Sequence, residues 1–149
     1  MWERFSYYGM RAILILFMVT PSENGGLGLS VAAAGAVYAL YTASVYLACL
    51  PGGWIADQIT GQKNATFAGA IIIMFGHLAL AVPLETTFYL GLFLLVVGTG
   101  LLKPNISIMV GQLYAQNDHR RDAGYSIYYM GINIGAFLSP LVCGWLAQD

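Results

Sequence analysis

The chain has 149 residues, of which 58% are hydrophobic and 9% are charged, and its formal net charge at pH 7 is −1. Soluble domains carry about 25% charged residues, so this composition excludes an ordinary soluble domain. Several apolar runs reach the roughly 20 residues that cross a bilayer, and the near-neutral charge gives no basis for binding nucleic acid. We therefore predict an all-α integral membrane protein.

Apolar runs separated by turn residues predict five membrane-spanning helices. The first connection begins at Pro21 and runs through Gly26, and Ser30 is the expected N-cap of the second helix. Polar connections are expected at 58–63 and 116–122. The predicted helices cover about 1–20, 30–57, 64–83, 87–114 and 122–147.

The basic residues outside these helices lie in connections on one side of the predicted bundle. They are Lys63, Arg120 and Arg121, whereas the connections on the other side contain no Lys or Arg. The positive-inside rule then places the first set, and with it the N-terminus, in the cytoplasm.

The first predicted helix begins with a polar cluster that leads into an apolar continuation. A helix turns about 100° per residue, so Glu3, Arg4, Tyr7, Tyr8 and Arg11 fall within an arc of roughly 140°. Such a face is expected to look into a helix bundle or a water-filled cavity rather than into lipid.

Two cations, Arg11 and Lys103, lie within predicted spans. A charge at the centre of a bilayer costs about 2.5–3.5 kcal/mol on insertion scales. Arg4 lies near a membrane end and can snorkel, but Arg11 and Lys103 are deeper. Few carboxylates lie within the helices, so these cations need counter-charges elsewhere, such as an anionic ligand. A guanidinium can grip a carboxylate with two hydrogen bonds, and an ammonium adds a point charge.

Two polar stripes with helical spacing predict a cavity lining. An interfacial aromatic belt would also suit Tyr125, and an inter-helix hydrogen bond would also suit Asn133. The stripes consist of Tyr38, Thr42 and Tyr46 in the second helix and of Tyr125, Tyr129 and Asn133 in the fifth.

The remaining candidates favour structural roles. Gly131 and Gly135 are spaced for close helix packing, and His77 stands alone in an apolar helix. Cys49 and Cys143 suit small buried hydrophobes better than a disulfide or a metal pair. We find no P-loop, zinc spacing or nucleophile motif, and we therefore predict neither an enzyme nor a cofactor or metal site.

Four segments resemble the motifs of a known family. Residues 3–11 are similar to the first-helix motif of the proton-dependent oligopeptide transporters, and residues 98–105 to their fourth-helix lysine motif. Residues 128–135 resemble their fifth-helix signature. The turn at 53–63 resembles the loop motif of the wider major facilitator superfamily.

This resemblance implies a twelve-helix fold of two six-helix halves. The chain would supply the first five helices of the N-terminal half, and the sixth helix and the C-terminal half would lie outside it. Its implied partners are di- and tripeptides, the lipid bilayer of the cell membrane and the other half of the transporter. Protons are the implied coupling ion.

The resemblance also implies roles for individual residues. Arg11 and Lys103 would receive the carboxylate of the peptide, and Asn133 would hold its amino end. The remaining implied roles are pocket lining for Tyr8, Tyr46 and Tyr129, with Tyr7 and Tyr38 as weaker candidates, proton coupling for Glu3 and Arg4, and a structural loop motif at Gly53, Asp57, Gly61 and Lys63.

The chain departs from the family pattern at three places. The first glutamate of the coupling element would precede Met1. Ala39 stands where mammalian members have a histidine, which resembles bacterial members, and Gln112 stands where many members have an acid.

We therefore expect a proton-coupled symporter of di- and tripeptides that works by alternating access. The alternatives are a related transporter of another anion-bearing solute, such as nitrate or a peptide-like metabolite, and a non-transporting membrane scaffold or receptor. For a transporter, Arg11, Lys103, Tyr46 and Asn133 should face one shared cavity.

Overall fold

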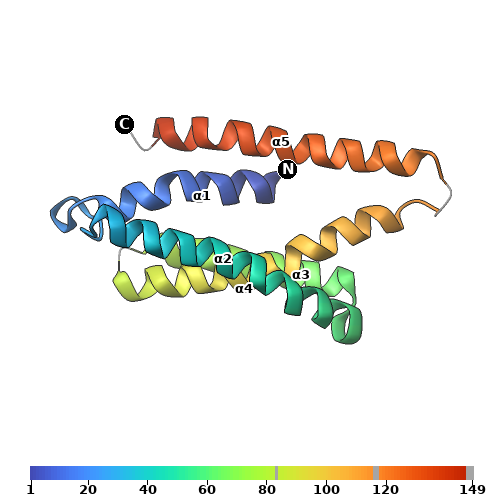
Figure 1. Cartoon of the computed structure of the whole chain (residues 1–149), viewed down its shortest axis with the longest axis horizontal. Coiled ribbons are helices and arrows are strands. Elements are labelled where there is room, and N and C mark those ends of the chain that lie inside the picture. Colours follow the sequence, from blue (N-terminus) through green and yellow to red (C-terminus); the bar gives the residue numbers. More distant parts are fainter. Residues whose placement is uncertain (83, 116–117, 147–149) are drawn as a thin grey trace. The chain divides into compact units, whose positions relative to one another are not determined.

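The computed structural model describes residues 1–82, 84–115 and 118–146, and all of its regular structure is helical (Figure 1). A short 3₁₀ turn, η1, follows the first helix, and a π-helical turn, η2, follows the second. The elements in chain order are α1 (Trp2–Val19), η1 (Ser22–Asn24), α2 (Val31–Ile55), η2 (Ala56–Thr60), α3 (Gln62–Leu80), α4 (Glu85–Gln112) and α5 (Arg120–Leu146).

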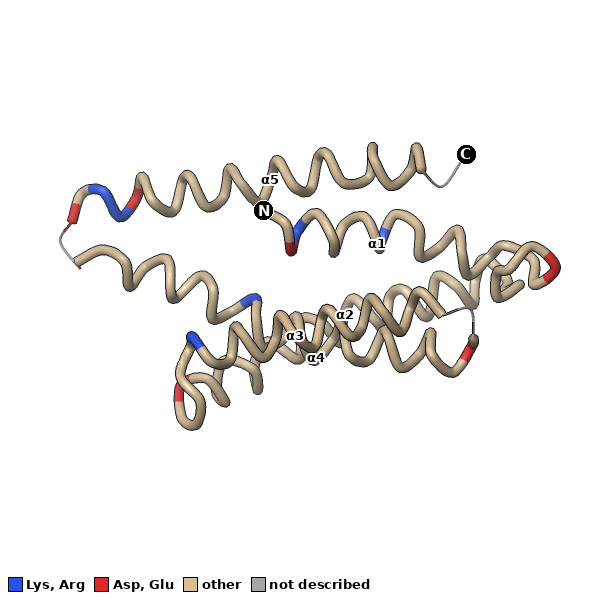
Figure 2. The backbone as a smooth tube through the Cα atoms, turned by 180° about the vertical axis from the view of Figure 1, so that it is seen from behind, with Lys and Arg blue, Asp and Glu red and all other residues tan. Residues whose placement is uncertain are grey.

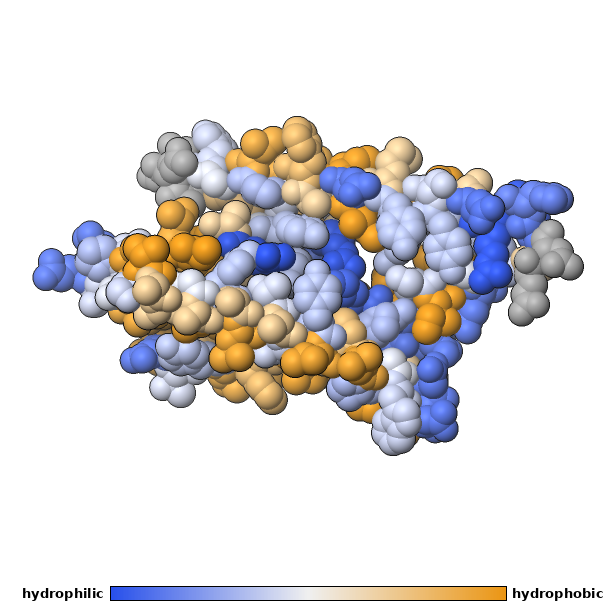
Figure 3. Space-filling model, in the orientation of Figure 1, coloured by the Kyte–Doolittle hydropathy of each residue, from blue (hydrophilic) through white to orange (hydrophobic). Residues whose placement is uncertain are grey.

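Four stretches of the described chain are long and apolar enough to cross a membrane, namely Val31–Thr60, Gln62–Leu80, Glu85–Gln112 and Arg120–Leu146. We predicted five spanning helices, and the one outside this group is α1. Its 18 residues include three charged side chains, Glu3, Arg4 and Arg11, which make it less apolar than the other four. Charged residues elsewhere lie mostly at helix ends and connections (Figure 2). Hydrophobic side chains cover much of α5 and α2 on the face shown in Figure 3.

The chain divides into two compact units. One comprises Met1–Tyr38 and Tyr114–Asp149, and the other comprises Ala39–Leu113. The first unit therefore contains α1, the whole of α5 and the beginning of α2. The second unit contains the rest of α2 together with α3 and α4.

In the first unit, α1 and α5 run side by side in the same direction (Figure 1). Small residues of both helices allow this approach. A Cβ atom on Gly135 would lie 2.8 Å from the carbonyl oxygen of Met1, and one on Gly9 would lie 2.6 Å from Oγ of Ser139. Ser139 is fully buried and donates a hydrogen bond to the carbonyl of Phe5. Close packing had been predicted at Gly131 and Gly135. The approach is tight at Gly135 and extends along α5 to Ser139, whereas a Cβ on Gly131 would lie 4.0 Å from Cβ of Met1.

In the second unit, α3 and α4 form an antiparallel pair held by glycines. Gly69 lies against Gly98, and Gly76 lies against Gly91. The carbonyl oxygen of each glycine lies 2.7–3.2 Å from where a Cβ would stand on its partner. Because lipid gives helices no hydrophobic reason to associate, such close van der Waals contact is what binds them together.

The helix ends follow local capping chemistry. The hydroxyl of Ser30 accepts a hydrogen bond of 3.2 Å from the backbone N–H of Ala33, which confirms the predicted N-cap. The fifth helix begins at Arg120, earlier than the predicted 122, because Asp118 accepts a backbone hydrogen bond of 2.9 Å from Arg120. The hydrogen bonds from Arg120, chiefly from its side chain, lower the pKa of Asp118. The predicted helix ends at 83 and 147 and the loop start at 116 lie outside the described residues.

The α3–α4 contact gives a stability test. In Gly98→Ala, the new methyl carbon would lie 2.9 Å from the carbonyl oxygen of Gly69 and 2.9 Å from the backbone nitrogen of Ile73. Neither backbone atom can turn aside, so we expect the free energy of unfolding to fall by about 1–3 kcal/mol. Thermal unfolding of the purified protein in detergent measures this. Gly35→Ala is the matched control, because no atom of a neighbouring element in the described chain lies within 4 Å of its added carbon. Equal melting temperatures for the two variants would contradict the packing role.

Candidate functional site

The guanidinium of Arg11 lies among three tyrosines of the first unit. Its Nε donates a hydrogen bond of 2.7 Å to the hydroxyl of Tyr38, and a terminal nitrogen donates to the same oxygen. Its central carbon lies 5.0 Å from the ring centroid of Tyr38, 5.4 Å from that of Tyr7 and 5.9 Å from that of Tyr8. Within α1, the spacing of Tyr7, Tyr8 and Arg11 places these three residues on one helical face. Tyr38 joins them from the first turns of α2.

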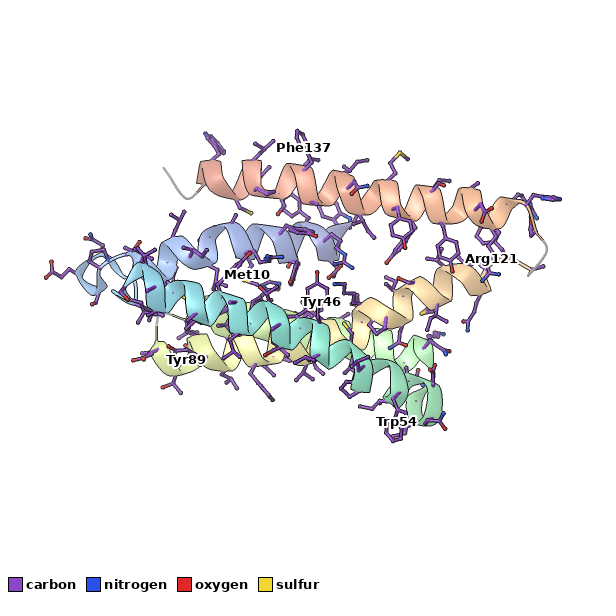
Figure 4. The ribbon with its side chains drawn as sticks, viewed as in Figure 1. Met10, Tyr46, Trp54, Tyr89, Arg121 and Phe137 are labelled. Atoms are coloured by element: carbon purple, nitrogen blue, oxygen red, sulfur yellow. The ribbon has the colours of Figure 1, made fainter. Side chains whose placement is uncertain are left out.

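Lys103 has a different setting in the second unit. Its ammonium nitrogen lies 4.1 Å from the ring centroid of Tyr46, which projects from α2 and is 60% exposed (Figure 4). Within the described ranges, neither Lys103 nor Arg11 forms an ion pair with a carboxylate. Both cations are therefore held by the negative faces of aromatic rings, an interaction of about 0.5–2 kcal/mol. Such partners leave the positive charge available to an anion.

The two predicted residues of α5 lie on its open side. Tyr129 and Asn133 are both exposed and line a shallow hollow on this helix, together with Ser126, Met130, Ile134, Phe137 and Leu138. Figure 4 shows Phe137 on the side of α5 away from α1. This polar-apolar face is thus separate from the small-residue face that packs on α1. The predicted shared cavity combines residues of both units and stays a prediction.

The predicted coupling pair lies at the start of α1. An oxygen of Glu3 lies 3.2 Å from Nε of Arg4, and Arg4 is buried with 8% of its surface exposed. Gly135 lies close behind it, because a Cβ there would stand 3.4 Å from Cβ of Arg4. The pair is therefore held against α5, in a setting where an ion pair is poorly screened by water.

The predicted loop motif surrounds the π turn η2. The side-chain amide of Gln62 donates a hydrogen bond of 3.0 Å to Asp57 across the turn, and Gly61 takes a φ of 75°. Only glycine adopts this left-handed conformation without strain, so Gly61 lets the chain reverse into α3. Gly53 lies near Pro104 of α4, and Lys63 is exposed at the start of α3.

Two polar residues of the structure had received no role from the sequence. Asn105 is fully buried in the second unit and donates a hydrogen bond to α2. Ser139 is fully buried in the first unit and donates a hydrogen bond to α1. Ser139 could have been found, because it continues the four-residue spacing of Gly131 and Gly135. Asn105 follows Lys103 and Pro104, and an asparagine in an apolar helix already indicates a buried hydrogen bond.

A family model described as the POT family matches residues 63–149 of this sequence. The chain belongs to the POT family. The relatives of this family whose names state a role are transporters. The family membership predicted from the four motifs is confirmed.

Individual relatives agree over almost the whole chain. The uncharacterized transporter YclF of Bacillus subtilis is 53% identical, and a di-/tripeptide transporter of Lactococcus lactis is 50% identical, each over 99% of this chain. The crystal structure of a POT peptide transporter variant in complex with alafosfalin superimposes with a TM-score of 0.93, at 53% identity over 96% of this chain. The matched region is about 30% of the length of each of these proteins.

The Arg11–Tyr38 contact gives a second test. In Tyr38→Phe the ring remains but the hydroxyl that accepts from the guanidinium is lost. A hydrogen bond to a charged group contributes about 1.5–3 kcal/mol, and we expect the free energy of unfolding to fall by this order. The measurement is denaturation of the purified protein in detergent. Tyr46→Phe is the control, since it keeps the ring over Lys103 and removes an exposed hydroxyl. An unchanged free energy of unfolding in Tyr38→Phe would show that the Tyr38 hydroxyl contributes little.

Proposed function

We propose that the protein containing this chain is a proton-coupled symporter of di- and tripeptides in the cell membrane. The observation that carries the proposal is the pair of cations within α1 and α4 whose described partners are tyrosines rather than carboxylates. The proposal places both cations, with Tyr46 and Asn133, around one cavity formed with the other half of the transporter. The di-/tripeptide transporter of Lactococcus lactis supports this substrate class.

A peptide carries one carboxylate and one amine at its ends whatever its side chains are. In our proposal Arg11 and Lys103 bind the carboxylate, because a guanidinium offers two parallel hydrogen bonds and an ammonium adds charge. Asn133 binds the amino end through its carbonyl oxygen. Tyr8, Tyr46 and Tyr129 contact the peptide backbone and side chains, and Tyr7 and Tyr38 are secondary candidates for the same role. Recognition of the two ends alone lets one pocket accept many sequences.

Proton coupling in this proposal uses the Glu3–Arg4 pair. When a carboxylate takes up a proton it loses its charge, and its attraction to a neighbouring guanidinium is lost with it. Protonation of Glu3 would thus release Arg4 and alter how α1 is held in the bundle. Helix α1 also carries Arg11, so this release reaches the proposed peptide site along a single rigid element.

The proposal predicts that Lys103→Ala abolishes uptake driven by an inward proton gradient. Removing the ammonium takes away one of the two charges that bind the carboxylate. The measurement is uptake of labelled dialanine into proteoliposomes that contain the full-length protein, with the gradient imposed or collapsed. Arg121→Gln, which removes one charge near the start of α5, is the control and should retain gradient-driven uptake. Normal uptake by Lys103→Ala would refute the assigned role.

The same assay separates the alternatives. Uptake of dialanine that ignores the gradient would remove the symport claim. Failure with dialanine but uptake of nitrate or of another solute bearing an anionic group would favour a related transporter. If the folded protein moved no small solute at all, a scaffold or receptor would be favoured.

We further propose that the N-terminus is cytoplasmic, on the basis of the basic residues Lys63, Arg120 and Arg121. In a background without native cysteines, Glu23→Cys should then react with a membrane-impermeant maleimide in intact cells. His119→Cys should react only after the cells are permeabilised. The reverse pattern would invert the proposed topology.

A further inference from the structure

Helices α2 and α4 cross at a contact between two glycines. A Cβ atom on Gly52 would overlap the carbonyl oxygen of Gly100, and one on Gly100 would lie 2.7 Å from the carbonyl oxygen of Ala48. Pro104 has no N–H, so it cannot donate the usual helical hydrogen bond to Gly100. The backbone of Gly52 faces the oxygen that is left, where a Cα–H group can contact it. The crossing thus depends on close backbone contact.

Asn105 adds the side-chain link at this crossing. Its amide nitrogen donates a hydrogen bond of 2.6 Å to the carbonyl of Leu101 on its own helix and a longer one of 3.4 Å to the carbonyl of Gly52 on α2. The residue is fully buried, and within the described part of the chain its Oδ1 accepts no hydrogen bond. A buried acceptor without a partner destabilises a fold. An apolar residue of similar shape would avoid that loss, so stability alone does not account for asparagine here.

Lys103 and Asn105 contact α2 from different sides. They are two positions apart, so they project about 200° apart around α4. Lys103 reaches the ring of Tyr46, and Asn105 reaches the carbonyl of Gly52. The two contacts flank the Gly52–Gly100 approach and oppose rotation of α4 in both directions. Of the two, the buried hydrogen bond from Asn105 to the backbone of α2 is the one that can fix the rotation of α4 at this crossing, because the stem of Lys103 is flexible.

We propose that Asn105 is a positioning residue for Lys103, fixing the rotation of α4 against α2 so that the ammonium lies over Tyr46. Its effect on peptide binding rests on the proposed function, whereas its effect on the setting of Lys103 does not. The asparagine is retained for the direction of its hydrogen bond, as buried polar groups can be when they specify one arrangement of helices.

The test compares Asn105→Leu with the parent in the full-length protein. Leucine resembles asparagine in shape but cannot donate, so we expect an equal or higher melting temperature together with a displaced Lys103. Modification of Lys103 by a small amine-reactive ester, followed by mass spectrometry, should be at least about threefold faster, because the ammonium is no longer held against the ring. Asn105→Ala repeats the measurement without added bulk. Thr99→Val removes a different buried polar group, a hydroxyl, from α4 and should leave the rate unchanged.

A second experiment measures the affinity for dialanine of the parent, of each single variant and of the double variant, which together form a double-mutant cycle. Asn105→Leu should weaken binding several-fold when Lys103 is present and should have no further effect in the Lys103→Ala background, since coupled residues are not additive. Equal effects in both backgrounds would overturn the positioning role. An unchanged modification rate in both Asn105 variants would also overturn it. If the parent binds no dialanine, the proposed function fails, while the modification rate still decides the role of Asn105.

Discussion

The positive charges within the apolar helices constrain everything else in this protein. A cation in a low-dielectric setting must have a partner, and a buried carboxylate would neutralise it permanently. The described chain uses tyrosines instead: three rings and a hydroxyl for Arg11, and a single ring for Lys103. A ring face satisfies the charge without cancelling it. The net positive charge is thereby kept for a ligand, which is what the proposed carboxylate site requires.

Holding these side chains in place requires helices that pack closely where no hydrophobic force drives them together. Glycine makes this possible in both units. Gly69 and Gly98 bring the backbones of α3 and α4 into contact, and Gly9 and Gly135 let α1 lie against α5. Large apolar side chains such as Met18 and Leu95 are fully buried, whereas others such as Phe67 and Phe137 remain exposed. The glycines therefore set how closely these helices approach one another, and the exposed apolar side chains are available to lipid.

The sequence predicts the chemistry of the site better than its geometry. The spacing of Tyr7, Tyr8 and Arg11 already placed them on one face, and the four motifs identified the family. Tyr38 was a weaker candidate, and its hydrogen bond to Arg11 depends on how α1 and α2 meet, which no local pattern encodes. Asn105 was missed for the same reason: the partner that explains it, Gly52, lies 53 positions away in the sequence. Capping at Ser30 was predictable because it depends only on neighbouring residues.

The two cations differ in how strongly the protein holds them, and the difference suits a division of labour in the proposed carboxylate site. Arg11 combines hydrogen bonds with three rings, so its guanidinium is oriented before any ligand arrives. Lys103 has one ring and a flexible stem, so its ammonium can move with little loss. A fixed guanidinium gives direction to a bound carboxylate, and a movable ammonium can follow that carboxylate as helices shift. In the proposed alternating access, Lys103 has the weaker contacts, so it is the cation whose partner can change between the outward-open and inward-open states.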